Sequence, residues 1–191
     1  MRLAILDRGH RLGTKILFAI IRTVSRHPVL DVIKLVKYRP DFYRAAAVTH
    51  EAMRGPSAWS VGDRELMAAV VARNNECEWC TTAHSAVAAG AYGDRSKVAA
   101  VLADLETAPI EEPLRATLRM LRKLTREHTV TADEMRAVLA AGVSPEQVED
   151  ALAVSFAFNV TTRLAEAFGF AMATPEAFES GAKYLLARGY R

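Results

Sequence analysis

The strongest constraint on the fold of this chain is a succession of segments in which apolar residues recur with the helical period of about 3.6 residues. Proline, glycine and asparagine separate these segments, and no stretch shows the alternation of apolar and polar residues that is typical of a strand. Aromatic residues make up only 7% of the sequence while alanine is abundant, a balance that favours closely packed helices over sheet surfaces. We therefore predict an all-α fold, formed by residues 1–191 as a single helical domain.

Local capping signals refine the limits of the expected helices. Thr131 and Ser144 each begin a capping box with Glu or Gln three residues later. Asp41 is a suitable N-cap, and Pro175 suits the first turn of the last helix. The expected helices cover residues 14–23, 30–37, 41–53, 60–74, 77–91, 96–105, 111–127, 131–141, 144–170 and 175–188.

The chain divides by charge into a basic arm and a more acidic remainder. Residues 1–46 carry ten Lys and Arg against three Asp, while the remainder carries fifteen against nineteen Asp and Glu. A basic arm of this kind is typical of a solvent-exposed face. It is also typical of a segment that binds an anionic membrane surface, nucleic acid or an acidic neighbouring subunit. No helix-turn-helix or zinc-finger spacing accompanies it, so we expect no nucleic-acid binding. The expected parts are a helical arm over residues 1–40, a core over residues 41–175 and a C-terminal helix over residues 176–191.

The arm also bears on location and assembly. No apolar run reaches the roughly 20 residues that span a bilayer, and segment 16–21 is too short for the apolar region of a signal peptide. We therefore expect a cytoplasmic protein without an integral membrane segment. An apolar stripe on the arm leads us to expect a homo-oligomer in which the arm covers a partner subunit. This stripe consists of Ile16, Leu17, Ile20 and Ile21.

The two cysteines of the chain, Cys77 and Cys80, form a Cys-x-x-Cys pair that indicates redox chemistry or metal binding. On a helix that begins near Cys77, both cysteines and His84 lie at positions i, i+3 and i+7 and share one face. A helix N-terminus and a nearby proton acceptor lower the pKa of a thiol from about 8.5. His84 lies one turn from Cys80 and two from Cys77, which favours Cys80 as the attacking thiol, whereas the helix dipole favours Cys77.

Other interpretations of the pair remain open at this level. Both thiolates and His84 match three ligands of a structural zinc site, with Glu65, His50 or His128 as a fourth. The cysteines also suit an inert buried pair, a fixed disulfide, or a redox-sensing or metal-binding oligomer without enzymatic activity. Glu65 by itself is typical of a first-turn helix carboxylate that the helix dipole stabilises.

The string Glu65-x11-Cys77-x2-Cys80-x3-His84 resembles the signature of the alkyl hydroperoxidase D and carboxymuconolactone decarboxylase superfamily. Trp79, an aromatic residue before the second cysteine, is similar to the peroxidase-related branch. Alkyl hydroperoxidase D itself has a histidine at this position, so one member of its proton relay is absent here. Members that decarboxylate a lactone generally lack the paired cysteines, which leaves lactone decarboxylation as an alternative with less support.

A second stretch, Asn159-x3-Arg163-Leu164, resembles a later helix of the same branch. The resemblance implies an alkyl hydroperoxidase D-like helical bundle, a trimer or hexamer, and reduction of a small-molecule peroxide through the dithiol. We expect no cofactor and no metal. By position, it implies that Cys80 is activated through His84 and Glu65, and that Cys77 resolves the oxidised Cys80. An external dithiol, such as a lipoyl group or a thioredoxin-like protein, would then reduce the disulfide.

Overall fold

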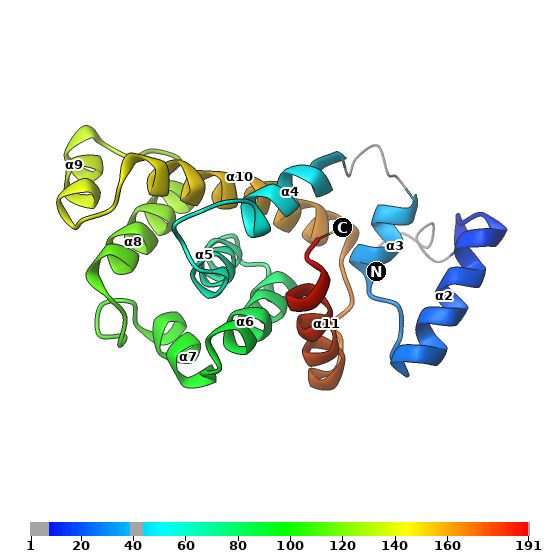
Figure 1. Cartoon of the computed structure of the whole chain (residues 1–191). Coiled ribbons are helices and arrows are strands. Elements are labelled where there is room, and N and C mark those ends of the chain that lie inside the picture. Colours follow the sequence, from blue (N-terminus) through cyan, green and yellow to red (C-terminus); the bar gives the residue numbers. More distant parts are fainter. Residues whose placement is uncertain (1–7, 39–43, 191) are drawn as a thin grey trace.

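The structure, a computed structural model, describes residues 8–38 and 44–190, and within them it contains α-helices and no strand (Figure 1). The all-α prediction is therefore confirmed, and each expected helix is present. Asp41, expected as an N-cap, lies outside the described residues. The helices are α2 (Leu12–Ser25), α3 (Asp31–Tyr38), α4 (Arg44–Arg54), α5 (Val61–Asn74), α6 (Glu78–Tyr92), α7 (Arg95–Ala103), α8 (Glu112–Glu127), α9 (Ala132–Ala140), α10 (Pro145–Phe168) and α11 (Pro175–Arg188).

The capping signals place most helix ends correctly. Thr131 and Ser144 accept a backbone hydrogen bond from the third residue of α9 and α10, and both capping boxes are complete. Some predicted ends were wrong: α2 extends two residues further than predicted at each end, and α7 and α10 end earlier than predicted. Helix α7 stops at Ala103 because Asp104 has extended backbone, and α10 stops at Phe168 because Gly169 adopts a left-handed conformation with φ of 60°.

Helix α5 is the centre of the fold. It packs against α4, α6, α8 and α10, and nearly every residue from Arg64 to Ala72 is buried. A helix that is covered on all sides needs apolar or paired residues around its whole circumference. Only two of these buried residues are charged, Arg64 and Glu65. The two charged side chains of the central helix are therefore buried, and neighbouring helices must supply hydrogen-bond or ion-pair partners for them.

A tight turn joins α5 to α6 and places the cysteines beside the core. Asn75 donates its backbone N–H to Val71, and Cys77 donates its own to the carbonyl of Ala72 at 3.0 Å. Glu76 between them has φ of 58°, a left-handed conformation that is uncommon for a residue with a side chain. This turn fixes the direction in which α6 leaves α5.

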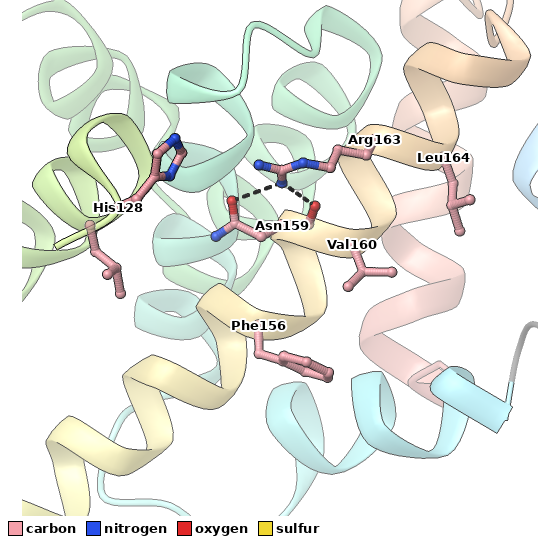
Figure 2. A pocket seen from close by; sticks show the side chains of 7 residues that line it. His128, Phe156, Asn159, Val160, Arg163 and Leu164 are labelled. Atoms are coloured by element: carbon pink, nitrogen blue, oxygen red, sulfur yellow. Dashed lines mark hydrogen bonds between the residues drawn. The ribbon is translucent and has the colours of Figure 1, made fainter.

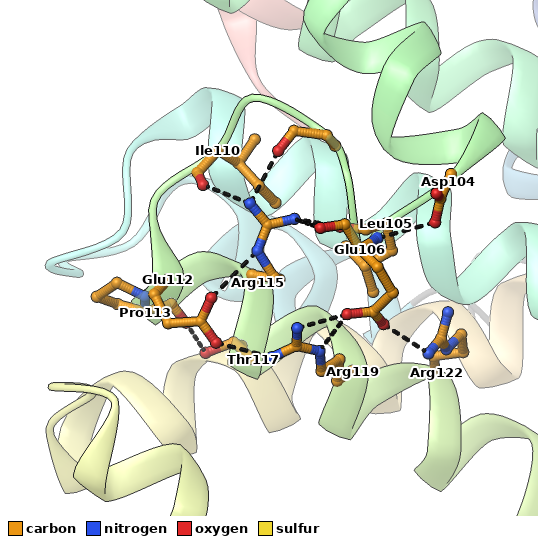
Figure 3. A network of polar contacts seen from close by, with 11 residues as sticks. Asp104, Leu105, Glu106, Ile110, Glu112, Pro113, Arg115, Thr117, Arg119 and Arg122 are labelled. Atoms are coloured by element: carbon orange, nitrogen blue, oxygen red, sulfur yellow. Dashed lines mark hydrogen bonds and ion pairs between the residues drawn. The ribbon is translucent and has the colours of Figure 1, made fainter.

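The loop between α7 and α8 is held by arginine side chains, as Figure 3 shows. Arg115 donates hydrogen bonds to four backbone carbonyls of the loop, those of Leu105, Glu106, Ala108 and Ile110. Arg119 pairs with Glu106 and Glu112 at the surface. The guanidinium of Arg115 thus satisfies carbonyls that have no helical partner.

The basic arm is only partly packed on the rest of the chain. Leu35 of α3 is buried, and Asp31 accepts the backbone N–H of Ala171 at 2.9 Å. Helix α2 lies beyond α3 at the edge of the molecule (Figure 1), and its apolar stripe is largely exposed, with Ile16 and Ile20 each 54% accessible. No helix within the described ranges is long and apolar enough to cross a membrane.

Candidate functional site

The two cysteines lie at the N-terminus of α6, as the sequence predicts. Cys77 is the N-cap, with extended backbone, and Cys80 lies in the first turn. Both are fully buried and both are free thiols. The sulfurs of the pair are close enough to share a hydrogen bond.

This hydrogen bond makes the two thiols unequal. The Cys80 thiol and the Cys80 backbone N–H both donate to the sulfur of Cys77, which lowers the pKa of Cys77 although burial opposes this. The pKa of Cys80 is raised, because its proton is held in the same hydrogen bond and because burial disfavours a second thiolate. Glu166 of α10 opposes ionisation of both cysteines. Each sulfur therefore influences the ionisation of the other, and the roles of the two cysteines stay a prediction.

His84, two turns into α6, is directed at Glu65 of α5. Its Nδ1 lies 2.8 Å from Glu65 Oε2, and its ring meets the edge of Phe158 with the centroids 4.3 Å apart. Both side chains are buried, Glu65 completely. The structure thus brings these two predicted residues together. The hydrogen bonds of His84 within the described residues are those with Glu65 and Tyr190, and its role towards Cys80 stays a prediction.

Two further residues surround Glu65, and the sequence analysis did not identify either. Arg54, at the end of α4, donates to Glu65 Oε1 at 2.7 Å. The hydroxyl of Tyr190, beyond α11, donates to Oε1 at 2.8 Å and lies 3.0 Å from Oε2. Arg54 also lies over the Tyr190 ring, 5.2 Å from its centroid. A buried carboxylate on α5 was the available signal that such partners exist.

These partners decide the charge of the cluster. Burial raises the pKa of Glu65, but the hydrogen bond and charge of His84 and the ion pair with Arg54 outweigh it and hold the pKa below its ordinary value. Burial and the Glu65 carboxylate raise the pKa of Tyr190 well above its ordinary value. Glu65 is therefore an anion, Arg54 a cation and Tyr190 a neutral donor.

Around the cysteines the surroundings are apolar. Trp79 packs edge to face against Phe170 and Phe178, with centroids 5.4 and 5.6 Å away. These three aromatic rings belong to the same cluster as both cysteines. Leu30 and Val32, from the segment that enters α3 and from α3 itself, pack against it. Part of the N-terminal arm thus covers the dithiol of its own chain.

The Asn159-x3-Arg163 stretch supports the turn before Cys77 from outside. Asn75 donates its amide to Asn159 Oδ1 and Thr162 Oγ1, both at 3.0 Å. Arg163 in turn donates to the side-chain and backbone oxygens of Asn159, and it lines a surface pocket with Phe156 (Figure 2). The stretch therefore fixes the position of the turn before Cys77.

The structure bears on the zinc alternative as well. Among the residues that it describes, no group of three or more His, Cys, Asp and Glu side chains is arranged to hold a metal ion. His50 accepts the backbone N–H of Tyr190, and His128 lines the pocket of Figure 2 on the surface. His50 thus has a partner elsewhere, and His128 is exposed.

The helical fold and the buried dithiol at a helix start agree with the predicted resemblance. Residues 40–123, which include Glu65, Cys77, Cys80 and His84, match the carboxymuconolactone decarboxylase family. No curated protein sequence matches the chain. The family match and the structural similarities below confirm the predicted resemblance to this superfamily.

Solved structures share the fold over most of the chain. An uncharacterized peroxidase-related protein from Silicibacter sp. TM1040 is 25% identical, with a TM-score of 0.73 and 87% of each chain covered. An alkylhydroperoxidase AhpD core protein from Ralstonia eutropha JMP134, also uncharacterized and peroxidase-related, is 23% identical, with a TM-score of 0.73 and 93% of each chain covered. The debrominase Bmp8 in its apo form is 16% identical, with a TM-score of 0.70, and the match covers 90% of this chain and 92% of that one.

Proposed function

We propose that this protein is a thiol-dependent peroxidase that reduces organic hydroperoxides through Cys77 and Cys80. The observation that carries the proposal is the hydrogen-bonded pair of buried thiols at the start of α6, one turn from a His84–Glu65 pair. A thiolate that forms at a helix N-terminus near a base is the nucleophile that peroxide reduction needs.

The proposed cycle has three balanced steps. A thiolate attacks the outer oxygen of R–O–OH, the O–O bond breaks, and the products are a sulfenic acid and an alcohol R–OH that takes up one proton. The second thiol attacks the sulfenic sulfur, and water leaves as the disulfide forms. An external dithiol then reduces the disulfide and is itself oxidised to a disulfide. His84, held by Glu65, accepts the thiol proton and returns it to the leaving oxygen.

The apolar surroundings support an organic substrate in particular. Trp79, Phe170 and Phe178 lie in the same cluster as the sulfurs, and Leu30 of the arm covers it. Such walls bind the alkyl or aryl part of a hydroperoxide and give hydrogen peroxide nothing comparable. We therefore propose a higher kcat/KM for cumene hydroperoxide than for hydrogen peroxide.

The roles of the two sulfurs follow from competing arguments. The one-turn spacing to His84 and the family resemblance favour attack by Cys80. The hydrogen bond that Cys80 donates favours Cys77 as the resting thiolate. We propose that Cys80 attacks after passing its proton to His84, because the rate depends on the reacting anion and not on the most stable one. Cys80→Ser should then form no sulfenic acid with peroxide, while Cys77→Ser should form one that persists; a trap that labels only Cys77 would reverse the roles.

Thiol counting tests the function itself. The chain has only two cysteines, so a fully reduced sample contains two titratable thiols. Excess cumene hydroperoxide should remove both, and dithiothreitol should restore both, with no change in subunit mass beyond the loss of two hydrogens. Two thiols that survive excess peroxide would contradict the proposal.

Two further measurements complete the test. Analysis of the purified protein for bound metal tests the non-enzymatic metal-binding alternative. Dihydrolipoamide and a thioredoxin-type dithiol are the reductants to compare.

A further inference from the structure

We infer that Tyr190 is a positioning residue for the proposed dithiol chemistry, and that its hydroxyl shares the charge of Glu65 and so limits how tightly the paired His84 ring holds a second proton. The inference rests on the proposed function and extends it to a residue outside the dithiol signature. It is carried by the contacts of the Tyr190 hydroxyl with both Glu65 oxygens and by its approach to His84.

The direction of each hydrogen bond follows from the groups involved. A carboxylate only accepts, so the Tyr190 proton points at Glu65. The Nδ1 of His84 then faces two oxygens, Glu65 Oε2 at 2.8 Å and the Tyr190 oxygen at 3.3 Å, whose own proton is directed elsewhere. Nδ1 therefore carries a proton whether the ring is neutral or charged, and the ring gains or loses its second proton at Nε2. The Nε2 atom, on the side of the ring away from Glu65, is then the atom that can accept a proton from a thiol.

The hydroxyl also limits how strongly Glu65 attracts a second proton to His84. Among the described residues, the charged groups near the cluster are Arg54 from α4 and Glu65 and Arg64 from α5, and Phe158 of α10 packs against the imidazole. Two donors, Arg54 and Tyr190, share the charge of the carboxylate. Removal of one donor leaves more negative charge facing His84, which then binds a proton more tightly.

The backbone conformation before Tyr190 allows the Tyr190 hydroxyl to reach Glu65 and His84. Gly189 has φ of 67°, and a Cβ at this position would lie 2.7 Å from the His50 ring. A residue with a side chain would therefore be strained and would push the segment away. The Tyr190 N–H donates to His50 Nδ1 at 3.2 Å, and the Tyr190 ring lies nearly parallel to that of His84. The hydroxyl is thus delivered by a turn that only glycine suits.

The substitution Tyr190→Phe tests the inference because it removes the hydroxyl and keeps the ring. The matched control is Tyr184→Phe, since Tyr184 is 58% exposed on α11. We would follow the titration of the His84 ring by NMR in protein whose cysteines are both changed to serine, with the resonance assigned by His84→Gln. In the Tyr190→Phe protein the midpoint should lie about one pH unit higher than in the parent, the size expected for one lost hydrogen bond to a charged group. The Tyr184→Phe midpoint should match the parent.

A second variant and a second readout complete the test. Deletion of residues 190 and 191 should also raise the midpoint of the His84 titration. Far-ultraviolet circular dichroism should confirm that the helices persist in this variant. In the cysteine-containing protein, the acid limb of kcat for cumene hydroperoxide should move upward with the NMR midpoint while KM stays constant. An unchanged or lower midpoint in Tyr190→Phe would overturn the inference. Absence of peroxide turnover would overturn the proposed function alone, because the NMR titration needs no turnover.

Discussion

The buried ion pair between Arg54 and Glu65 makes a quantitative prediction about stability. Glu65 is fully buried and Arg54 is about nine-tenths buried, and their nitrogen and oxygen lie 2.7 Å apart. Loss of one partner leaves a buried charge without compensation, which costs about 3–5 kcal/mol. We expect Glu65→Gln and Arg54→Met each to lower the free energy of unfolding by that amount.

The double variant should cost much less than the sum of the two single variants. Without Arg54 no cation is left unpaired, and the amide that Glu65→Gln introduces would still accept hydrogen bonds from Tyr190 and His84. Residues in direct contact show coupling energies of about 0.5–3 kcal/mol, and a buried pair belongs at the upper end. We therefore expect a coupling of about 2–3 kcal/mol between the two substitutions.

Urea unfolding at pH 7, followed by circular dichroism, measures all four free energies. The surface pair Arg95 and Glu179 is the control, because its atoms lie 2.9 Å apart but both side chains are more than half exposed. The same cycle there should show little coupling. If the two substitutions at Arg54 and Glu65 are additive, with a coupling energy no larger than that of the surface pair, the charge argument is refuted.

The same carboxylate predicts a pH dependence. The pKa of Glu65 is lower in the folded protein than its ordinary value of 4.5, so folding favours the anion. The stabilisation is fully present above about pH 4.5 and is lost as the pH falls through the folded value. Glu65→Gln should flatten this part of the acid-unfolding curve, and a curve identical to the parent's would contradict the assignment.

Three further predictions concern other parts of the fold. Phe158→Ala, which removes a buried ring beside His84, should cost about 3–5 kcal/mol in urea unfolding. Arg115→Lys should speed hydrogen exchange in the loop between α7 and α8 and leave the core protected, because one ammonium cannot replace the planar donors that reach four carbonyls. The pair Ile16→Ser and Ile20→Ser should reduce the oligomer mass seen by light scattering, and a parent protein that is a monomer of 20.9 kDa would reject the role of the arm.

The helices and the dithiol could be predicted from the sequence because their signals are local. Capping at Thr131 or Ser144 involves residues three positions apart, and the apolar period involves residues within two turns. The register of Cys77, Cys80 and His84 is likewise set by one helix. Where a left-handed glycine ended a helix, at Gly169, the periodic pattern continued past the true end and misled the prediction.

The sequence by itself thus determined which side chains lie together on α6, and the family resemblance implied that Glu65 on the preceding helix is their partner. Only the tertiary structure decided how that partner is held. Arg54 and Tyr190 lie 11 and 125 positions from Glu65, and neither belongs to a pattern of helical period or capping that points to it. The physical reason is burial: once packing places the Glu65 carboxylate out of water, its charge must be matched by whatever donors the fold brings within about 3 Å, however distant in sequence they are.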